Sequence, residues 1–425
     1  MQKITASKPI LTQIFLLGYA IYVALLFNVA FDKLFNWYAL GLVFLGFCCV
    51  RPEQITGLWQ TLTSSATMKL FSASMLGIVL ILSVATFRQL PQTEGLLSLG
   101  AQCWVPFALA TLSCLILLEY KNGISYLLKV FTAGAITIAC FDIWLYYQQW
   151  AAITPMDVGN RHRELADAYI FFIPFLFLLA ILNNSSLYKL TIWTLIILMS
   201  ALSIGSGARG IYIVLAIEWV ILLRVAVFPL FSDKPLIPFK KGLFLFSTLI
   251  LVFSVTAHYI FPQFFFGALH RGLSVDARML HTWQPTLYFI AQEPLSGFGL
   301  GLNAWNSVYA ANQIHLPGAI NVGSAHNWIL QLGFQGGVPL IGLMALLVFS
   351  YYWQAVKIFV YPNSDLLLKK SSFIIGLVFF GFYVVRGLVE TPNWKPFYLL
   401  VTFFLLLCCE YRMVLGADNK PRQIL

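Results

Sequence analysis

The stretch Val322–Pro339 reads V-G-S-A-H-N-W-I-L-Q-L-G-F-Q-G-G-V-P and joins a long polar segment to an apolar run. The apolar run begins near residue 327 and continues to about residue 355, which is long enough to cross a bilayer as a helix. His326 stands at the junction and is followed by Asn327. A titratable imidazole just outside a hydrophobic span suits acid or base chemistry at a membrane surface. His326 is therefore the first candidate functional residue. The glycine pair Gly336 and Gly337 predicts a place where this span bends or packs closely against a neighbour.

The composition is that of an integral membrane protein. Of 425 residues, 60% are hydrophobic and 10% are charged, and the mean hydropathy is +0.83, which is too apolar for a soluble domain of this size. The apolar stretches are continuous instead of alternating, which favours transmembrane helices over strands. The basic residues are dispersed among short loops, so the net charge of +10 indicates membrane orientation and no nucleic-acid partner. The seven cysteines lie in or beside apolar runs without metal-ligand spacing, so we expect no disulfide or metal site.

Hydropathy predicts an all-α polytopic membrane protein, with one integral membrane domain over residues 1–425 and twelve spans. An even number of spans places both termini on the same side of the membrane. The predicted spans are residues 9–29, 35–50, 70–87, 99–118, 127–148, 167–183, 188–205, 209–229, 243–260, 327–355, 371–389 and 396–411.

The basic residues give this topology an orientation. Of 26 lysines and arginines, 17 fall on the side of the termini, which the positive-inside rule assigns to the cytoplasm. Seven of the nine on the opposite side are arginine, against four of the 17. Because a guanidinium binds phosphate oxygens in pairs, the excess of arginine over lysine on the outer face favours a phosphorylated ligand there. The alternative is that this excess arises by chance in a small sample. The nine are Lys33, Arg88, Arg161, Arg163, Arg209, Arg271, Arg278, Arg386 and Lys395.

Residues 261–326 form the only long outer loop, and its length predicts a functional or partly folded segment. Ser274 is a candidate cap for a helix over Val275–Gln292, which Pro285 would kink. We expect this helix to lie along the membrane interface through an apolar face. The glycines of P-L-S-G-F-G-L-G at 294–301 indicate turns, since no strand precedes them as a nucleotide-binding loop would need.

Arg209 and Arg278 are the leading candidates for binding an anion. Arg209 lies in G-S-G-A-R-G (205–210), a tight hairpin between two apolar spans, where a guanidinium beside an accessible backbone suits phosphate. The alternative is an arginine that only sets topology. Arg278 begins the amphipathic part of the long loop, where an exposed interfacial charge is the commoner explanation.

Three further arginines are supporting candidates. Arg161 and Arg163 lie in N-R-H-R-E-L, where nearby acids including Asp167 favour a solvated loop. Arg386 and Glu390 stand four residues apart at the outer end of the eleventh span, a spacing at which they would simply pair.

Other titratable residues give weaker signals. Asp142 and Glu218 lie within predicted spans, which suggests either a proton path or hydrogen bonding to neighbouring helices. The other five histidines make no metal-binding pattern.

Three local motifs resemble the bacterial O-antigen ligase family, which is related to O-antigen polymerases and protein O-oligosaccharyltransferases. The first is the His326–Asn327 pair followed by Gly336. The second is the arginine turn at Arg209, where the family commonly has serine before the arginine and this chain has Ala208. The third is Arg278 upstream of Trp283 and the P-L-x-G-x-G at 294–299. The layout of spans and the long loop extend the resemblance over most of the chain.

The resemblance implies a helical fold of the membrane glycosyltransferase C type in the bacterial inner membrane, with an active site facing the periplasm. It implies transfer of a glycan from undecaprenyl pyrophosphate to lipid A-core oligosaccharide, with inversion and without metal or other cofactor. His326 would be the base, and Arg209 and Arg278 would bind the pyrophosphate, with support from Asn327.

The acceptor is left open by the sequence. A protein O-oligosaccharyltransferase would use a serine or threonine of a protein, and an O-antigen polymerase another lipid-linked glycan, with the same donor. A lipid or polysaccharide transporter is a third alternative, which predicts inverted repeats and a polar site at mid-membrane.

Overall fold

The computed structural model describes residues 9–27, 32–88, 93–120, 123–152, 158–183, 185–228, 237–260, 265–267, 270, 278–313, 321 and 323–418. Within these ranges every regular element is helical and there is no strand. The α-helices are α1 (Pro9–Leu25), α2 (Asp32–Cys49), α3 (Pro52–Leu62), α4 (Ala66–Arg88), α5 (Thr93–Leu99), α6 (Val105–Leu117), α7 (Gly123–Ala152), α8 (Val158–Leu182), α9 (Ser186–Ile204), α10 (Arg209–Val227), α11 (Phe239–Val255), α14 (Gln284–Gln292), α15 (Leu302–Asn312), α16 (Trp328–Val360), α17 (Leu366–Phe379) and α18 (Trp394–Asp418). Short π- or 3₁₀-helical segments are η2 (Gly100–Trp104), η3 (Thr256–Ile260), η4 (Met279–Trp283), η6 (Phe380–Val385) and η7 (Arg386–Leu388).

All twelve predicted spans fall on helices. Ten helices in the described ranges are long and apolar enough to cross a membrane, which is the architecture of a polytopic membrane protein. The other two predicted spans are α1, which is shorter, and α2, which bends by 102° into α3. The bend follows from Pro52, because the residue before a proline is disfavoured in a helix and Arg51 is accordingly extended. Twelve complete crossings therefore stay a prediction.

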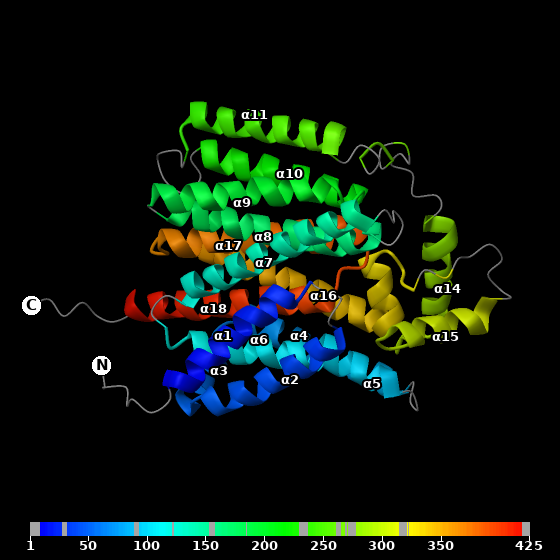
Figure 1. Ribbon diagram of the computed structural model, residues 1–425. Helices are drawn as coiled ribbons and strands as arrows, with labels where there is room; N and C mark the ends of the chain where they lie inside the picture. Colours follow the sequence, from blue (N-terminus) through cyan, green and yellow to red (C-terminus); the bar gives the residue numbers. More distant parts are fainter. Residues whose placement is uncertain are drawn as a thin grey trace, which may run out of the picture.

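The long helices lie side by side, and α14 stands across their direction at one end of the bundle (Figure 1). We call this end, with α14 and α15, the loop end. The opposite end, where α18 finishes, is the terminal end. The ring of Phe35 at the start of α2 stacks on Tyr22 near the end of α1 at 5.0 Å and lies 4.8 Å from the ammonium of Lys395 at the start of α18. The end of α1, the start of α2 and the start of α18 therefore meet at the loop end. The start of α1 and the end of α18 consequently both lie at the terminal end.

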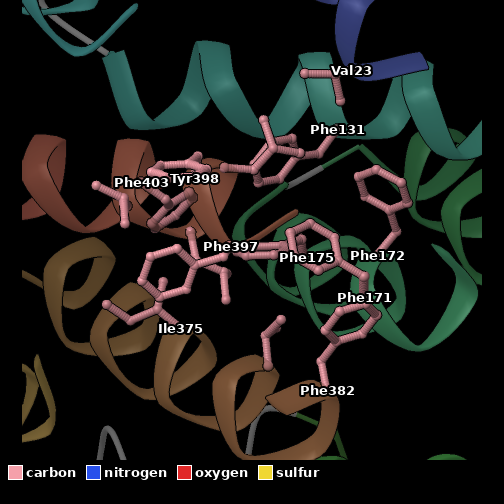
Figure 2. Close-up of a cluster of buried hydrophobic side chains, with 14 of the residues drawn as sticks. Val23, Phe131, Phe171, Phe172, Phe175, Ile375, Phe382, Phe397, Tyr398 and Phe403 are labelled. Atoms are coloured by element: carbon pink, nitrogen blue, oxygen red, sulfur yellow. The ribbon is translucent and has the colours of Figure 1, made fainter. Parts of the chain in front are cut away.

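The centre of the bundle is an aromatic cluster around α8 (Figure 2). Phe171 and Phe175 of α8 contact Phe382 and Phe403 of the C-terminal helices at ring distances of 5.7 and 5.2 Å. In the most apolar part of α8, 83% of the residues are buried, against 11% in α11 at the edge. This packing holds the loop-end turns of α8 and η7 next to each other.

Helix α16 is broken at the predicted glycine pair. Gly337 has a φ of 69° and Gly336 departs from helical geometry, which confirms the expected bend. The loop at 294–299 fills the break: the amides of Phe298 and Gly299 donate to the carbonyls of residues 334 and 335 at 2.8 and 2.9 Å. A Cβ on Gly297 would lie 2.5 Å from the amide nitrogen of Gly336, so glycine is required there. The loop glycines therefore make turns, as predicted, and also a close backbone contact.

The described part of the long loop folds on the first turns of α16. The rings of Phe298 and Trp305 lie 5.2 and 4.8 Å from that of Phe334, and Phe289 completes this small core. We call residues 279–312 with 328–335 the loop lobe. Of its two short helices, α14 lies within the helix expected over 275–292, whereas the sequence located no helix at α15. The side of the membrane on which the lobe lies stays a prediction.

The helix expected over 275–292 is described from Met279 to Gln292, and its proposed cap Ser274 lies outside the described residues. A π-helical turn precedes Pro285, which accommodates the missing N–H and gives the expected irregularity. Leu280 and Leu287 remain 54% and 55% exposed, so the helix keeps an apolar outer face. Contact of that face with the membrane interface stays a prediction.

Candidate functional site

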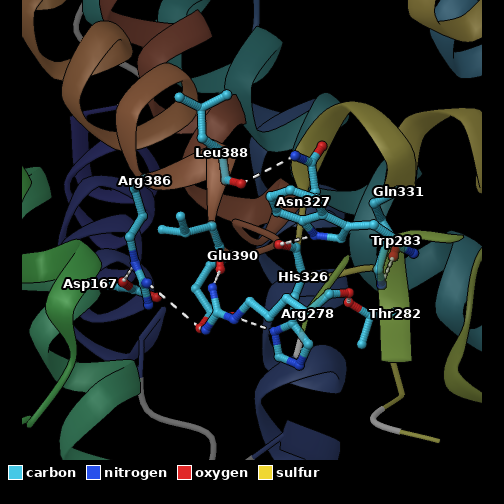
Figure 3. Close-up of polar contacts among 12 residues, drawn as sticks. Asp167, Arg278, Thr282, Trp283, His326, Asn327, Gln331, Arg386, Leu388 and Glu390 are labelled. Carbon is cyan, nitrogen blue, oxygen red and sulfur yellow. Dashed lines mark hydrogen bonds and ion pairs between the residues drawn. The ribbon is translucent and has the colours of Figure 1, made fainter. Parts of the chain in front are cut away.

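The carboxylate of Glu390 is the centre of a polar cluster at the loop end (Figure 3). One oxygen lies 2.6 Å from Nδ1 of His326, and the other accepts from a guanidinium nitrogen of Arg278 at 3.0 Å and lies 3.7 Å from Arg386. Arg278 also donates to the backbone carbonyl of Val389. The structure thus brings His326 and Arg278 together through a residue that sequence reasoning had assigned only to pairing with Arg386.

His326 is held by backbone geometry as well as by Glu390. It has a φ of 47°, a left-handed conformation that is uncommon for a residue other than glycine. Its carbonyl accepts from the indole of Trp283 at 3.4 Å. Asn327 caps α16 by accepting from the amide of Leu330 and donates to the carbonyl of Leu388, both at 3.1 Å. Asn327 therefore ties the histidine to the turn that carries Glu390.

Arg386 binds the cluster to α8. Its side chain is only 5% exposed, and its Nε donates to Asp167 at 2.8 Å. The expected pairing with Glu390 is present at 3.7 Å, but Asp167 is the closer partner. The sequence had assigned Asp167 to neutralising the N-R-H-R segment. That assignment missed Arg386, which is 219 positions away in the chain.

Arg209 is the first residue of α10, immediately after the predicted tight hairpin. A Cβ on the next residue, Gly210, would lie 2.9 Å from a guanidinium nitrogen of Arg386 and from the side chain of Val389. The backbone of α10 therefore packs directly against the cluster, and a side chain at this position would displace Arg386 or Val389. Arg209 is thus one residue from a contact with Arg386.

Arg161 and Arg163 lie in the first turns of α8, which begins at Val158, so this segment is helical and not the loop expected. Their side chains lie outside the described part of the structure. Their support for an anion site stays a prediction.

The charges of the cluster are closely balanced. Burial raises the pKa of Glu390, but the hydrogen bond from His326 and the charges of Arg386, His326 and Arg278 lower it to about 2. Glu390 is therefore ionised at neutral pH. Glu390 and Asp167 offset the charges of Arg278 and Arg386.

Two acids, Asp142 of α7 and Glu218 of α10, lie within the spans. Tyr169 donates to Asp142, which supports the hydrogen-bonding interpretation of that acid. Both carboxyl oxygens of Glu218 are buried and have no hydrogen-bond partner within the part of the chain that the structure describes. Among the described residues, no group of three or more His, Cys, Asp or Glu side chains could hold a metal ion, and the expectation of no metal stays a prediction.

The fold and this cluster define a polytopic helical membrane protein with a histidine, carboxylate and arginine site at one end of the bundle. No protein-family model matches the chain. This chain is 23% identical over 366 residues to the O-antigen ligase of Salmonella typhimurium strain LT2. The aligned region covers 79% of this chain and 82% of that protein.

Proposed function

We propose that the protein is an O-antigen ligase-type glycosyltransferase. In this proposal it transfers a glycan from undecaprenyl pyrophosphate to lipid A-core oligosaccharide, with inversion and without metal. The observation that carries it is the contact of His326 Nδ1 with the ionised Glu390, which also holds Arg278. Similarity to the Salmonella protein over most of both chains supports it.

In this proposal His326 is the base. An ionised Glu390 accepts a hydrogen bond from Nδ1–H of His326, which leaves the lone pair of Nε2 available. Nε2 takes the proton of the acceptor hydroxyl as its oxygen bonds to the anomeric carbon. The bond from that carbon to the pyrophosphate oxygen breaks on the opposite face, which inverts the configuration. Glu390 stabilises the imidazolium that results.

The leaving pyrophosphate gains negative charge, and arginine forks stabilise such charge without a metal. Arg209 and Arg278 bind it in this proposal, with Arg386 holding Glu390 in position. Because Arg278 is bonded to Glu390 and Val389 in the structure, donor binding either adds to its free donors or shifts it toward the phosphate. Arg161 and Arg163 are proposed to extend the basic surface.

We also propose that the terminal end faces the cytoplasm and the loop end the periplasm of a bacterial inner membrane. Arg51, Lys357 and Arg412 lie at the terminal end, as the positive-inside rule requires. A reporter fused after Leu425 that is active only in the cytoplasm tests this orientation. Activity of a periplasm-specific reporter at the same position would reverse it.

His326→Ala tests the reaction. We expect loss of glycan-bearing lipopolysaccharide and accumulation of the lipid-linked donor, with normal amounts of the protein in the membrane. Unchanged lipopolysaccharide together with loss of glycosylated proteins would favour a protein O-oligosaccharyltransferase. Unchanged glycan transfer to every acceptor would remove His326 from the mechanism.

A further inference from the structure

The backbone of His326 is held in a conformation that the residue would not favour by itself. Within the part of the chain that the structure describes, His326 is the only residue other than glycine with a positive φ, at 47°. In the left-handed region Cβ comes too close to the following carbonyl oxygen, so such a residue persists only when its surroundings hold it there. The contacts on both sides of His326 must therefore supply this restraint.

Gln331 restrains the chain before the histidine. Its side-chain oxygen accepts a hydrogen bond from the amide of Ala325 at 3.0 Å. Ala325 is 0% exposed and Gln331 is 9% exposed, so water does not compete for this bond. The bond joins the first turns of α16 to the residue before His326. It closes a loop of chain that contains the histidine.

Two other contacts restrain the chain after the histidine. The carbonyl of His326 accepts from the indole of Trp283, and the side chain of Asn327 donates to the carbonyl of Leu388 (Figure 3). With the chain fixed on both sides, the backbone of His326 has little freedom to leave the left-handed region. The same conformation brings Nδ1 to 2.6 Å from Glu390.

Helix capping does not account for the bond from Ala325 to Gln331. Asn327 already caps α16 by accepting from the amide of Leu330. In a capping box, a glutamate or glutamine at the third helical position bonds back to the amide of the cap residue. Gln331 is instead the fourth residue of α16, and it reaches past the cap to Ala325. His326 lies between the two ends of this bond.

We propose that Gln331 is a positioning residue that locks His326 in its left-handed conformation, with Nδ1 at Glu390. This inference rests on the proposed function, in which His326 is the base. Loss of the bond leaves the buried amide of Ala325 unpaired and allows His326 to relax to a negative φ. The cost of a left-handed residue and the contribution of one hydrogen bond are of similar size, so a single bond decides which conformation is populated.

Gln331→Met tests the lock, because methionine keeps the length and burial of the side chain but removes the amide oxygen. We expect the kcat of glycan transfer by the purified full-length protein to fall about tenfold, equivalent to about 1.4 kcal/mol. The KM for the lipid-linked donor should stay unchanged, because the proposed donor-binding residues Arg209 and Arg278 are not altered. A role in folding alone would not produce this split between kcat and KM.

Gln335→Met is the matched control. Gln335 lies one turn further along α16 and is 6% exposed, and its side-chain oxygen accepts from the indole of Trp394 at 3.1 Å. The two substitutions therefore each remove one buried hydrogen bond of α16, and both should lower the unfolding temperature. Only Gln331→Met should lower kcat.

Hydrogen exchange gives a readout that does not depend on activity. The amide of Ala325 should exchange faster in Gln331→Met than in the wild type or in Gln335→Met. An unchanged exchange rate at Ala325 would overturn the lock itself. Equal kcat values for the two glutamine variants, together with faster exchange, would overturn its role in positioning the base. A wild-type rate of transfer by His326→Ala would instead overturn the proposed function, and the positioning role with it, even where exchange at Ala325 is fast.

Discussion

The contact between His326 and Glu390 can be tested with Glu390→Gln, which keeps the length and an acceptor oxygen but removes the negative charge. A hydrogen bond to a charged group contributes about 1.5 to 3 kcal/mol. At 1.36 kcal/mol for each tenfold change in rate, its loss lowers the chemical step about 10- to 150-fold. The side chains of His326 and Glu390 are 28% and 18% exposed, so solvent screening favours the lower half of this range.

The assay is single-turnover glycan transfer from a purified lipid-linked donor, with donor and acceptor saturating. The rate of Glu390→Gln should fall between the wild type and His326→Ala, because the base remains but its imidazolium is less stabilised. Since the substitution removes a negative charge beside Arg278 and Arg386, the KM for the donor should not rise. Loss of folding would be visible as aggregation in detergent.

Glu293→Gln is the matched control. Glu293 also lies at the loop end and pairs with Arg88 at 3.4 Å, but it is 39% exposed and does not contact His326. Its rate should equal that of the wild type. A Glu390→Gln rate within twofold of the wild type would refute the view that Glu390 positions and stabilises the histidine.

Three further predictions concern the bend, the acid sensitivity and the donor. Gly337→Ala should lower the unfolding temperature, because it places a Cβ 2.4 Å from the carbonyl oxygen of Pro294 in a residue with a φ of 69°. Gly342→Ala in the same helix puts a Cβ into open space and should leave the unfolding temperature unchanged. Equal effects of the two substitutions would contradict the close contact at Gly337. The pKa of Glu390 is about 2 in the folded protein, against 4.5 for an ordinary glutamate side chain. Its ionised form therefore stabilises the contact between the loop lobe and the bundle above pH 4.5, and this stabilisation is lost as the pH falls toward 2. Hydrogen exchange of the loop lobe across this range should show the transition in the wild type and lack it in Glu390→Gln. Arg209→Lys should raise the KM for the donor about tenfold, which is the effect of losing one charge-assisted hydrogen bond. The control Arg88→Lys should leave this KM unchanged. If the two variants have the same KM for the donor, Arg209 does not bind the donor.

The sequence was informative where the signal was local. Continuous apolar runs located the helices, and Gly336 and Gly337 marked the bend in α16. The break after Arg51 also had a local signal in Pro52, although the hydropathy profile alone treated α2 as a simple span.

The cluster was only partly predictable because its contacts join distant segments. Topology placed His326 and Arg278 on the same face, but apolar periodicity does not show which loop ends meet. Glu390 lies 64 positions from His326, and its spacing from Arg386 suggested a local pair. The roles of these residues in catalysis and donor binding stay predictions.

The first turns of α16 connect the site to both the loop lobe and the bundle. Phe334 packs in the small core with Trp305, whereas Trp328 and Leu332 belong to the main core of the bundle. The contacts from His326 to Glu390 and from Asn327 to Leu388 join the start of this segment to η7 and the residues after it. A displacement of the loop lobe would therefore disturb the ring contact of Trp328 with Tyr383 together with the contact of His326 with Glu390. In the proposed reaction, assembly of the His326–Glu390 pair is thus coupled to packing in the bundle core.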